Sequence, residues 1–134
     1  MKIEPFLVAS TISIAIGQRL VRMICNNCKE EKILNENELE RLLEIIPDKK
    51  INSHKKFFHG KGCASCNHSG YIGRVVINEV LVADEDIREA IIRKASASEI
   101  KNIAIRNGMT PMIVDGIRKA MEGLTTIEEV LRVI

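Results

Sequence analysis

Two short stretches, Cys25-Asn-Asn-Cys28 and Cys63-Ala-Ser-Cys66, decide how this chain folds, because each places two thiols two residues apart. Two intervening residues let both sulfur atoms of a tight turn reach one cation, and two such turns supply a tetrahedron of ligands. Four sulfur ligands leave no open position for water or a substrate. The spacing therefore predicts one structural zinc site, with Cys25, Cys28, Cys63 and Cys66 as its ligands.

Four cysteines can also form two disulfides, a redox-active dithiol or an iron–sulfur cluster. Disulfides require an oxidising compartment, but the apolar stretch 6–16 is a poor signal peptide because Glu4 and Pro5 interrupt its beginning. The stretch is also too short to cross a bilayer. A reactive dithiol stands at a helix N-terminus after a strand, whereas Cys25 follows a predicted helix. A reducing compartment and a bound metal are therefore favoured.

Three histidines lie near the second cysteine pair in the sequence: His54, His59 and His68. Imidazole is a common zinc ligand, so each of them is a candidate replacement for a thiolate. Because four cysteines already complete a tetrahedral site, we predict that these histidines are surface residues or lie in the outer shell of the site.

The composition and charge of the chain argue against nucleic-acid binding. Aromatic residues make up 3% of the chain, whereas single-stranded nucleic acids are usually bound on aromatic stacking platforms. Four thiolates and one zinc ion would cancel the formal charge of +2, so no overall basic field remains. The lysine pairs at 49–50 and 55–56 are predicted to be solvated loop. A free-standing zinc ribbon that binds nucleic acid remains the alternative function.

No catalytic constellation is found in the sequence. It has no Gly-rich phosphate loop ending in Gly-Lys-Ser/Thr, no nucleophile elbow and no zincin histidine pair. The acidic residues are explained as helix faces or helix caps.

The N-terminal stretch 4–23 is predicted to be one helix. Pro5 suits a first helical turn, and Gly17 is the only later breaker. Apolar side chains cover nearly its whole circumference, and a helix that is apolar all round is normally buried on all sides. We expect either the local core or a partner domain to bury it.

The middle of the chain is predicted to alternate between helix and strand. Asn35 and Glu38 have the spacing of a capping box, and apolar residues at 39, 42, 43 and 46 predict a short helix that ends before Pro47. Residues 48–56 are predicted to form a polar loop and residues 55–59 a short strand. Residues 71–82 are the strongest strand candidate because they are rich in β-branched side chains.

Residues 84–134 are predicted to form four short helices in a compact bundle. Capping residues mark their beginnings at Asp84, Ser96, Thr110-Pro111 and Thr125 with Glu128, and glycines 108 and 123 end two of them. The predicted fold class is α+β and mainly α. A helix (1–24) is followed by a tetracysteine zinc-binding subdomain (25–70), and then by a short β segment and the helical bundle (71–134).

Several segments, in order along the chain, carry a resemblance to a known family. They are Glu4–Ser10, the run Gln18-Arg-Leu-Val-Arg22 before the first cysteine pair, residues 62–74 with Glu79 around and after the second pair, and residues 108–133 with Asp115-Gly116, Lys119 and Gly123-Leu-Thr-Thr. Together they resemble the C-terminal part of the type II secretion and type IV pilus assembly ATPases, over nearly all 134 residues.

The resemblance implies a parent protein that is a cytoplasmic hexameric motor, peripheral to the inner membrane. Such a motor acts through a platform protein in that membrane. The family's Walker A loop, aspartate box, Walker B motif and histidine box all precede the segment where this chain begins. We therefore expect a fragment that does not hydrolyse ATP, with ATP and Mg²⁺ bound only in the full-length parent. Residues 1–24 would end the RecA-like core, and Arg19 and Arg22 are candidates for a subunit interface.

Overall fold

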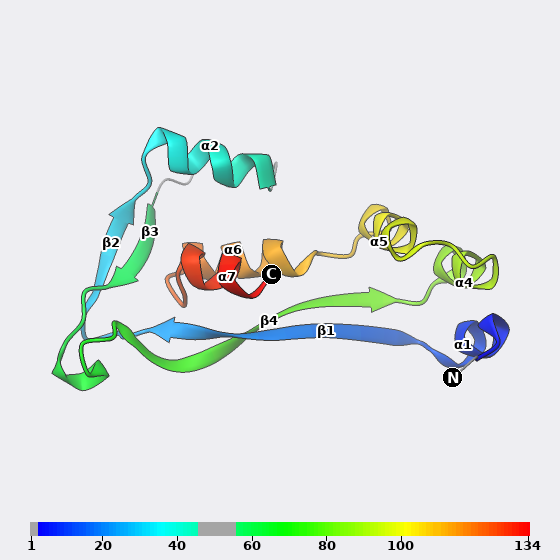
Figure 1. Cartoon of the computed structure of the whole chain (residues 1–134), viewed down its shortest axis with the longest axis horizontal. Helices are drawn as coiled ribbons and strands as arrows, with labels where there is room; N and C mark the ends of the chain where they lie inside the picture. The colour runs from blue at the N-terminus through cyan, green and yellow to red at the C-terminus, as the bar shows by residue number, and fades with distance from the viewer. Residues whose placement is uncertain (1–2, 46–55) are drawn as a thin grey trace. The chain divides into compact units, whose positions relative to one another are not determined.

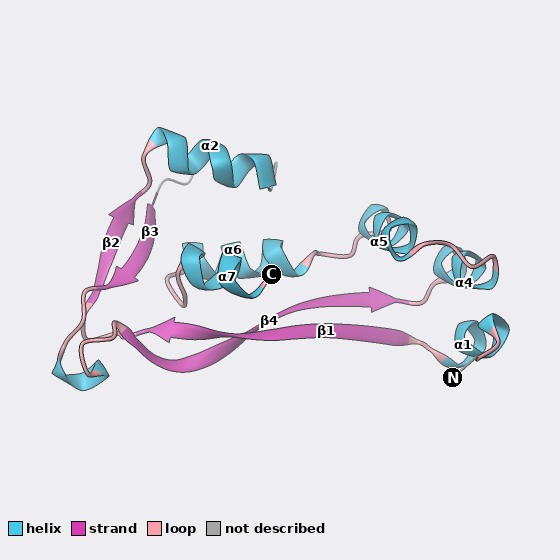
Figure 2. Ribbon diagram, viewed as in Figure 1, coloured by secondary structure: helices cyan, strands magenta, loops and turns pink. Residues whose placement is uncertain are grey.

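The computed structural model describes residues 3–45 and 56–134 and confirms an α+β chain (Figures 1 and 2). In chain order, its elements are α1 (Pro5–Thr11), β1 (Ile14–Ile24), β2 (Lys29–Ile33), α2 (Glu36–Ile45), β3 (Lys56–Gly60), the 3₁₀ turn η1 (Ala64–Cys66), β4 (Tyr71–Val82), α4 (Glu85–Ile92), α5 (Ala97–Arg106), α6 (Met112–Met121) and α7 (Ile127–Val133). Strand β1 pairs with β4, and β2 pairs with β3.

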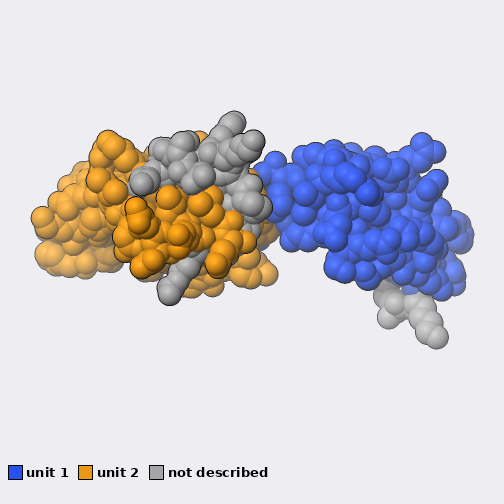
Figure 3. Space-filling model, turned by 90° about the horizontal axis from the view of Figure 1, so that it is seen from above, with its two compact units in different colours: residues 1–18, 78–111 blue, residues 19–77, 112–134 orange. Residues whose placement is uncertain are grey.

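The chain divides into two compact units, which Figure 3 colours separately. Unit 1 comprises residues 1–18 and 78–111, and unit 2 comprises residues 19–77 and 112–134. The boundary between the units therefore falls within both β1 and β4.

Unit 1 is built on α1, α4 and α5. Its core consists of small and β-branched side chains: Ala83, Ile87, Ala90, Ile103 and Ala104. The predicted caps are confirmed, since Asp84 accepts the Ile87 N–H at 3.0 Å and Ser96 accepts the Glu99 N–H at 3.2 Å. Asn107 at the end of α5 donates to Asp84 at 3.0 Å and ties the two helices together.

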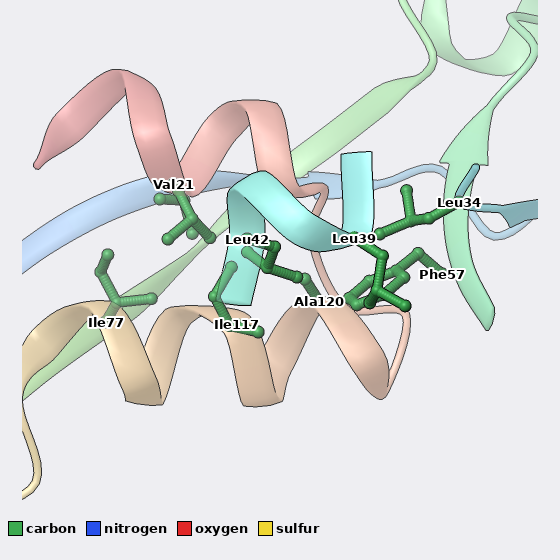
Figure 4. Packing of buried hydrophobic residues seen from close by; sticks show 9 residues of the cluster. Val21, Leu34, Leu39, Leu42, Phe57, Ile77, Ile117 and Ala120 are labelled. Atoms are coloured by element: carbon green, nitrogen blue, oxygen red, sulfur yellow. The ribbon is translucent and has the colours of Figure 1, made fainter. Parts of the chain in front are cut away.

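Unit 2 holds both cysteine pairs and is built around one larger core (Figure 4). That core takes side chains from β1, α2, β3, β4, α6 and α7 and from the connection between β2 and α2: Val21, Leu34, Leu39, Leu42, Phe57, Ile77, Ile117, Ala120 and Val130. The antiparallel β2–β3 pair runs in register from Lys29 opposite Gly60 to Ile33 opposite Lys56. The insertion between the cysteine pairs thus shares its hydrophobic core with the C-terminal helices.

The predicted helix over residues 4–23 is wrong beyond Thr11. Helix α1 ends there, and Ile14–Ile24 is a strand. Isoleucines at 12, 14 and 16 alternate along the chain, and β-branched side chains favour extended backbone. An apolar run of this kind fits a helix or a strand, and the pairing with β4 decides between them.

The other predicted elements lie where the sequence placed them, with two differences. The Asn35–Glu38 capping box is confirmed by reciprocal hydrogen bonds of 3.1 and 2.9 Å, and β4 covers residues 71–82 as predicted. The four C-terminal helices form, but α4 and α5 belong to unit 1 while α6 and α7 belong to unit 2. Strand β2 was not predicted, and the predicted loop at 48–55 with Ile46 and Pro47 lies outside the described residues.

Replacing Gly116 of α6 with alanine is expected to separate α6 from α7. A Cβ atom at Gly116 would lie 2.5 Å from Cγ1 of Val130, which is fully buried. Overpacking costs about 1–3 kcal/mol, which exceeds the gain of up to about 1 kcal/mol in helix propensity. Denaturant unfolding should therefore show a lower free energy of unfolding for Gly116→Ala than for the parent chain. The double variant Gly116→Ala with Val130→Ala should lose less unfolding free energy than the two single variants lose together. Additive losses would contradict a steric clash between these two positions.

Candidate metal centre

The four cysteines are brought together by the ends of four strands. Cys25 directly follows β1 and Cys28 directly precedes β2, while Cys63 and Cys66 lie at η1 between β3 and β4. Because Lys29 pairs with Gly60, the antiparallel β2–β3 ladder brings the two cysteine-bearing turns to the same end of the hairpin.

The distances between the sulfur atoms fit a tetrathiolate metal site. All four Sγ atoms lie within 4.8 Å of one another. The Sγ–Sγ distance is 3.8 Å for Cys25–Cys63 and for Cys63–Cys66, and 3.9 Å for Cys28–Cys66. Sulfurs placed tetrahedrally about 2.3 Å from one zinc ion are about 3.8 Å apart. A disulfide requires about 2.05 Å, and all four cysteines are free.

Backbone amides surround the sulfur atoms and favour their thiolate forms. The Gly62 N–H donates to Cys28 Sγ at 3.3 Å, and the N–H groups of Cys63 and Gly70 donate to Cys66 Sγ at 3.2 Å. The donation from Cys63, joined by that from Gly70, lowers the pKa of Cys66 to about 6. Burial instead raises the pKa of Cys28 to about 12. These N–H···S contacts are the outer-shell support that thiolate metal sites use.

Two glycines let the chain segments beside the site cross at close range. A Cβ atom on Gly60 would lie 2.1 Å from the carbonyl oxygen of Gly70, and one on Gly70 would lie 2.5 Å from that of Gly60. Gly70 also has a φ of +79°, a left-handed angle that other residues adopt at a cost. The same residue accepts the Cys25 N–H through its carbonyl at 2.9 Å, so the crossing touches both cysteine pairs.

We therefore expect Gly70→Ala to weaken metal binding at least about tenfold, because it displaces the hydrogen-bond partners of Cys25 and Cys66. Gly108→Ala is the matched control: Gly108 has a φ of +102°, but a Cβ there meets nothing within 4 Å. Backbone strain alone costs about 1–2 kcal/mol and should leave the site intact. Competition with a chromophoric chelator measures both affinities, and equal weakening in the two variants would contradict a specific role for the crossing.

The sequence of residues 1–132 matches the family described as Type II/IV secretion system protein. The chain belongs to this family. It is 42% identical over 131 residues to the type IV pilus assembly ATPase PilB of Thermus thermophilus, covering 98% of this chain and 14% of that protein. It is 40% identical over 134 residues to the type II secretion system protein E of Aeromonas hydrophila, covering 99% of this chain and 25% of that one.

This chain of the secretion family therefore spans a quarter or less of those two relatives. The resemblance that its motifs indicated is confirmed over nearly the whole chain. Within the described residues, no helix has the length and hydropathy needed to cross a membrane.

An ion-pair cluster around the buried carboxylate of Glu129, in unit 2, was not predicted. Glu129 is 2% exposed, and its carboxylate accepts the Arg22 N–H at 3.1 Å and the Arg22 guanidinium at 2.6 Å. Arg132 donates to both carboxylate oxygens at 3.1 and 3.0 Å, and the Arg22 guanidinium lies 4.2 Å from the centre of the Tyr71 ring. The Arg22 guanidinium is the main reason why the pKa of Glu129 falls to about 2. In this secretion-family chain, Arg22 thus has a partner within the chain itself.

The cap of α7 also differs from the prediction by one residue. Thr126, rather than Thr125, accepts the Glu129 N–H at 3.2 Å. The Thr125 hydroxyl instead donates to the carbonyl oxygen of Arg22 at 2.8 Å. Two adjacent threonines and two adjacent glutamates fit either register, so the capping pattern alone could not select one.

Two of the three histidines can be placed. His59 lies in β3 opposite Glu30, with its Nδ1 buried and without a hydrogen-bond partner among the described residues. His68 is exposed in the turn after Cys66, with a φ of +59°. His54 lies outside the described residues. The metal-binding group that the described chain brings together contains only the four cysteines.

Proposed function

We propose that this chain is the zinc-stabilised C-terminal module of a hexameric motor ATPase of type II secretion or type IV pilus assembly. In that motor it serves the docking of subunits and partners. The observation that carries the proposal is the tetrahedral spacing of four sulfurs in a chain that belongs to the secretion family. We assign no catalytic or nucleotide-binding residue to the chain, and ATP and Mg²⁺ belong to the full-length parent.

Cys25, Cys28, Cys63 and Cys66 would hold one Zn²⁺ ion in this proposal. A closed tetrathiolate site supplies a structural cross-link and no Lewis-acid chemistry. Binding of structural zinc contributes about 10 kcal/mol or more of apparent folding free energy. Around the site, the amides of Gly62, Cys63 and Gly70 stabilise the thiolates that the ion requires.

Exposed apolar side chains in unit 1 support the docking role. Phe6 of α1, Ile16 of β1 and Val82 of β4 are 59%, 64% and 57% exposed, and Leu7 and Ile14 are exposed as well. Most of the exposed large apolar side chains of the described residues lie in unit 1, and exposed apolar surface is typical of an interaction site. We propose that residues 1–24 and the end of β4 pack against the remainder of the parent ATPase.

The neighbouring subunits of the hexamer and the inner-membrane platform protein are the further partners that we propose. The parent would be cytoplasmic and would reach the membrane only through the assembled machine. Residues 25–70 would form its zinc-binding subdomain and residues 71–134 its C-terminal strand and helical region. Nucleic acid is not among the proposed partners, because the zinc-loaded chain carries no net basic charge.

Metal analysis of the chain purified without chelators tests the zinc assignment. We expect one zinc per chain, and cobalt substitution should give the thiolate-to-metal charge-transfer bands of a tetrahedral site. Less than half an equivalent of metal together with intact disulfides would overturn it. In the same preparation we expect no ATP turnover, with a full-length family member as the positive control. Robust turnover by this chain alone would contradict its proposed place in the motor.

A further inference from the structure

The end of β1, from which Cys25 extends, is held on both of its edges. Successive residues of a strand direct their backbone groups to opposite edges. On one edge, the Cys25 N–H donates to the carbonyl oxygen of Gly70 at 2.9 Å, at the start of β4. On the other edge, the Ile24 N–H donates to the carbonyl oxygen of Leu124 at 3.0 Å.

The second edge is completed by side chains from the beginning of α7. Thr125 donates its hydroxyl to the Arg22 carbonyl at 2.8 Å, and Glu129 accepts the Arg22 N–H at 3.1 Å. On this edge, the N–H groups of Arg22 and Ile24 and the carbonyl oxygen of Arg22 all form hydrogen bonds with the segment 124–129. That segment therefore takes the place of a third strand beside β1.

We propose that Thr125 and Glu129 are positioning residues of the metal centre. They fix the last residues of β1, and so determine where the Cys25 sulfur lies relative to the other three thiolates. This inference rests on the proposed zinc site. It adds two residues that lie about 100 positions from Cys25 in the sequence and hold no metal themselves.

Burial makes this contact stiff. Thr125 is 0% exposed and Glu129 is 2% exposed, so neither side chain can exchange its partner for water without unfolding the contact. Glu129 is held in place by Arg132 at 3.0 Å and by the Thr126 cap at 3.2 Å. An acceptor that is itself fixed transmits its position to the strand that donates to it.

The other cysteine pair is tied to the same helix end. The Tyr71 hydroxyl lies 3.2 Å from the Thr126 hydroxyl, within hydrogen-bond distance. Tyr71 directly follows Gly70, whose N–H donates to Cys66 Sγ at 3.2 Å. Strands β1 and β4, two of the four strands that end at the metal centre, are thus both anchored at the beginning of α7.

The coupling must act in both directions, because binding free energies are linked. If Thr125 and Glu129 tighten metal binding by some factor, the bound metal stabilises the docking of α7 on β1 by the same factor. Loss of an outer-shell partner typically weakens a metal site about 10–100-fold. For these residues, which act through one strand, we expect about tenfold.

The test compares Thr125→Val and Glu129→Gln with Glu128→Gln. Glu128→Gln removes the same charge one residue away, from a side chain that is 64% exposed and pairs with Lys32 at 3.0 Å. Leu39→Ala serves as a second control, because it destabilises the core of unit 2 from α2 and changes no residue of α7 or β1. Zinc affinity is measured by chelator competition under conditions in which circular dichroism shows each variant to be folded.

We expect about tenfold weaker binding for Thr125→Val and Glu129→Gln, and affinities within twofold of the parent chain for both controls. Removal of the metal should also speed amide exchange at Glu129 and Val130. If all four variants bind alike while the parent chain binds zinc, the positioning role is wrong and the zinc site stands. If the parent chain binds no metal, the proposed function itself fails.

Discussion

Replacing Cys66 with serine is expected to abolish stoichiometric zinc binding and to unfold most of unit 2. Cys66 is buried, accepts two backbone N–H groups and lies within 3.9 Å of two other sulfurs, so it occupies the most constrained corner of the site. Metal binding contributes about 10 kcal/mol or more of apparent folding free energy, which is comparable to the whole stability of a small domain.

Metal analysis and thermal unfolding with and without chelator measure this effect. Ser65→Ala is the control in the same turn, because the exposed Ser65 hydroxyl contacts only the Asn27 amide among the hydrogen bonds of the described chain and is no ligand. It should keep one zinc per chain and nearly the parent stability. In hydrogen exchange, Cys66→Ser should lower amide protection in unit 2 more than in α4 and α5, which have their own core. A Cys66→Ser chain that retained full zinc occupancy would contradict the tetrathiolate site.

The second large effect is expected from acid, through Glu129. Its pKa falls from 4.5 in the unfolded chain to about 2 in the folded one, chiefly because Arg22 donates to it. A carboxylate with a lowered pKa contributes stability that is complete above its unfolded pKa and is lost as the pH falls through the folded value. The shift corresponds to about 3 kcal/mol, present at neutral pH and gone near pH 2.

Comparison with Glu129→Gln tests this contribution, because the variant mimics the protonated side chain. Zinc is kept saturating for both proteins, since unit 2 needs it to stay folded, and the difference that follows from their separately measured zinc affinities is subtracted. The difference in unfolding free energy between the parent chain and the variant should be about 3 kcal/mol at pH 6 and should shrink steadily below pH 4. In the zinc-loaded chain, carbon NMR should show the Glu129 carboxyl still ionised at a pH at which an exposed glutamate is already half protonated. A titration midpoint near 4.5 would show that the Arg22–Glu129 contact does not hold the charge.

Parts of this structure follow from local sequence. Asp84 and Ser96 cap α4 and α5 as predicted, and Asn35 and Glu38 form their capping box, because each cap depends on residues only three apart. The strand at 71–82 could be predicted for a similar reason: its β-branched side chains favour extended backbone before any partner is chosen.

The errors lie where distant residues decide. Ile14–Ile24 has an apolar pattern compatible with either helix or strand, and only pairing with β4 makes it extended. Glu129 follows another glutamate and looks like a solvent-facing residue. Its burial depends on Arg22, which is 107 positions away, and no pattern in a single sequence predicts that contact. The sequence does contain the correct capping pattern, Thr126 with Glu129, but this pattern could not be distinguished from Thr125 with Glu128.

The sequence by itself indicated the candidate metal centre, because a Cys-x2-Cys turn directs two sulfurs to one point through local geometry and two such turns complete a tetrahedron. Only the tertiary structure decided what surrounds that centre. It placed the insertion between the cysteine pairs on the C-terminal helices through a shared core, and it set Thr125 and Glu129 against the strand that carries Cys25. The physical reason is the separation in sequence of the residues that interact. Turns and caps depend on residues a few positions apart, whereas burial and strand pairing depend on distant segments that pack together and exclude water.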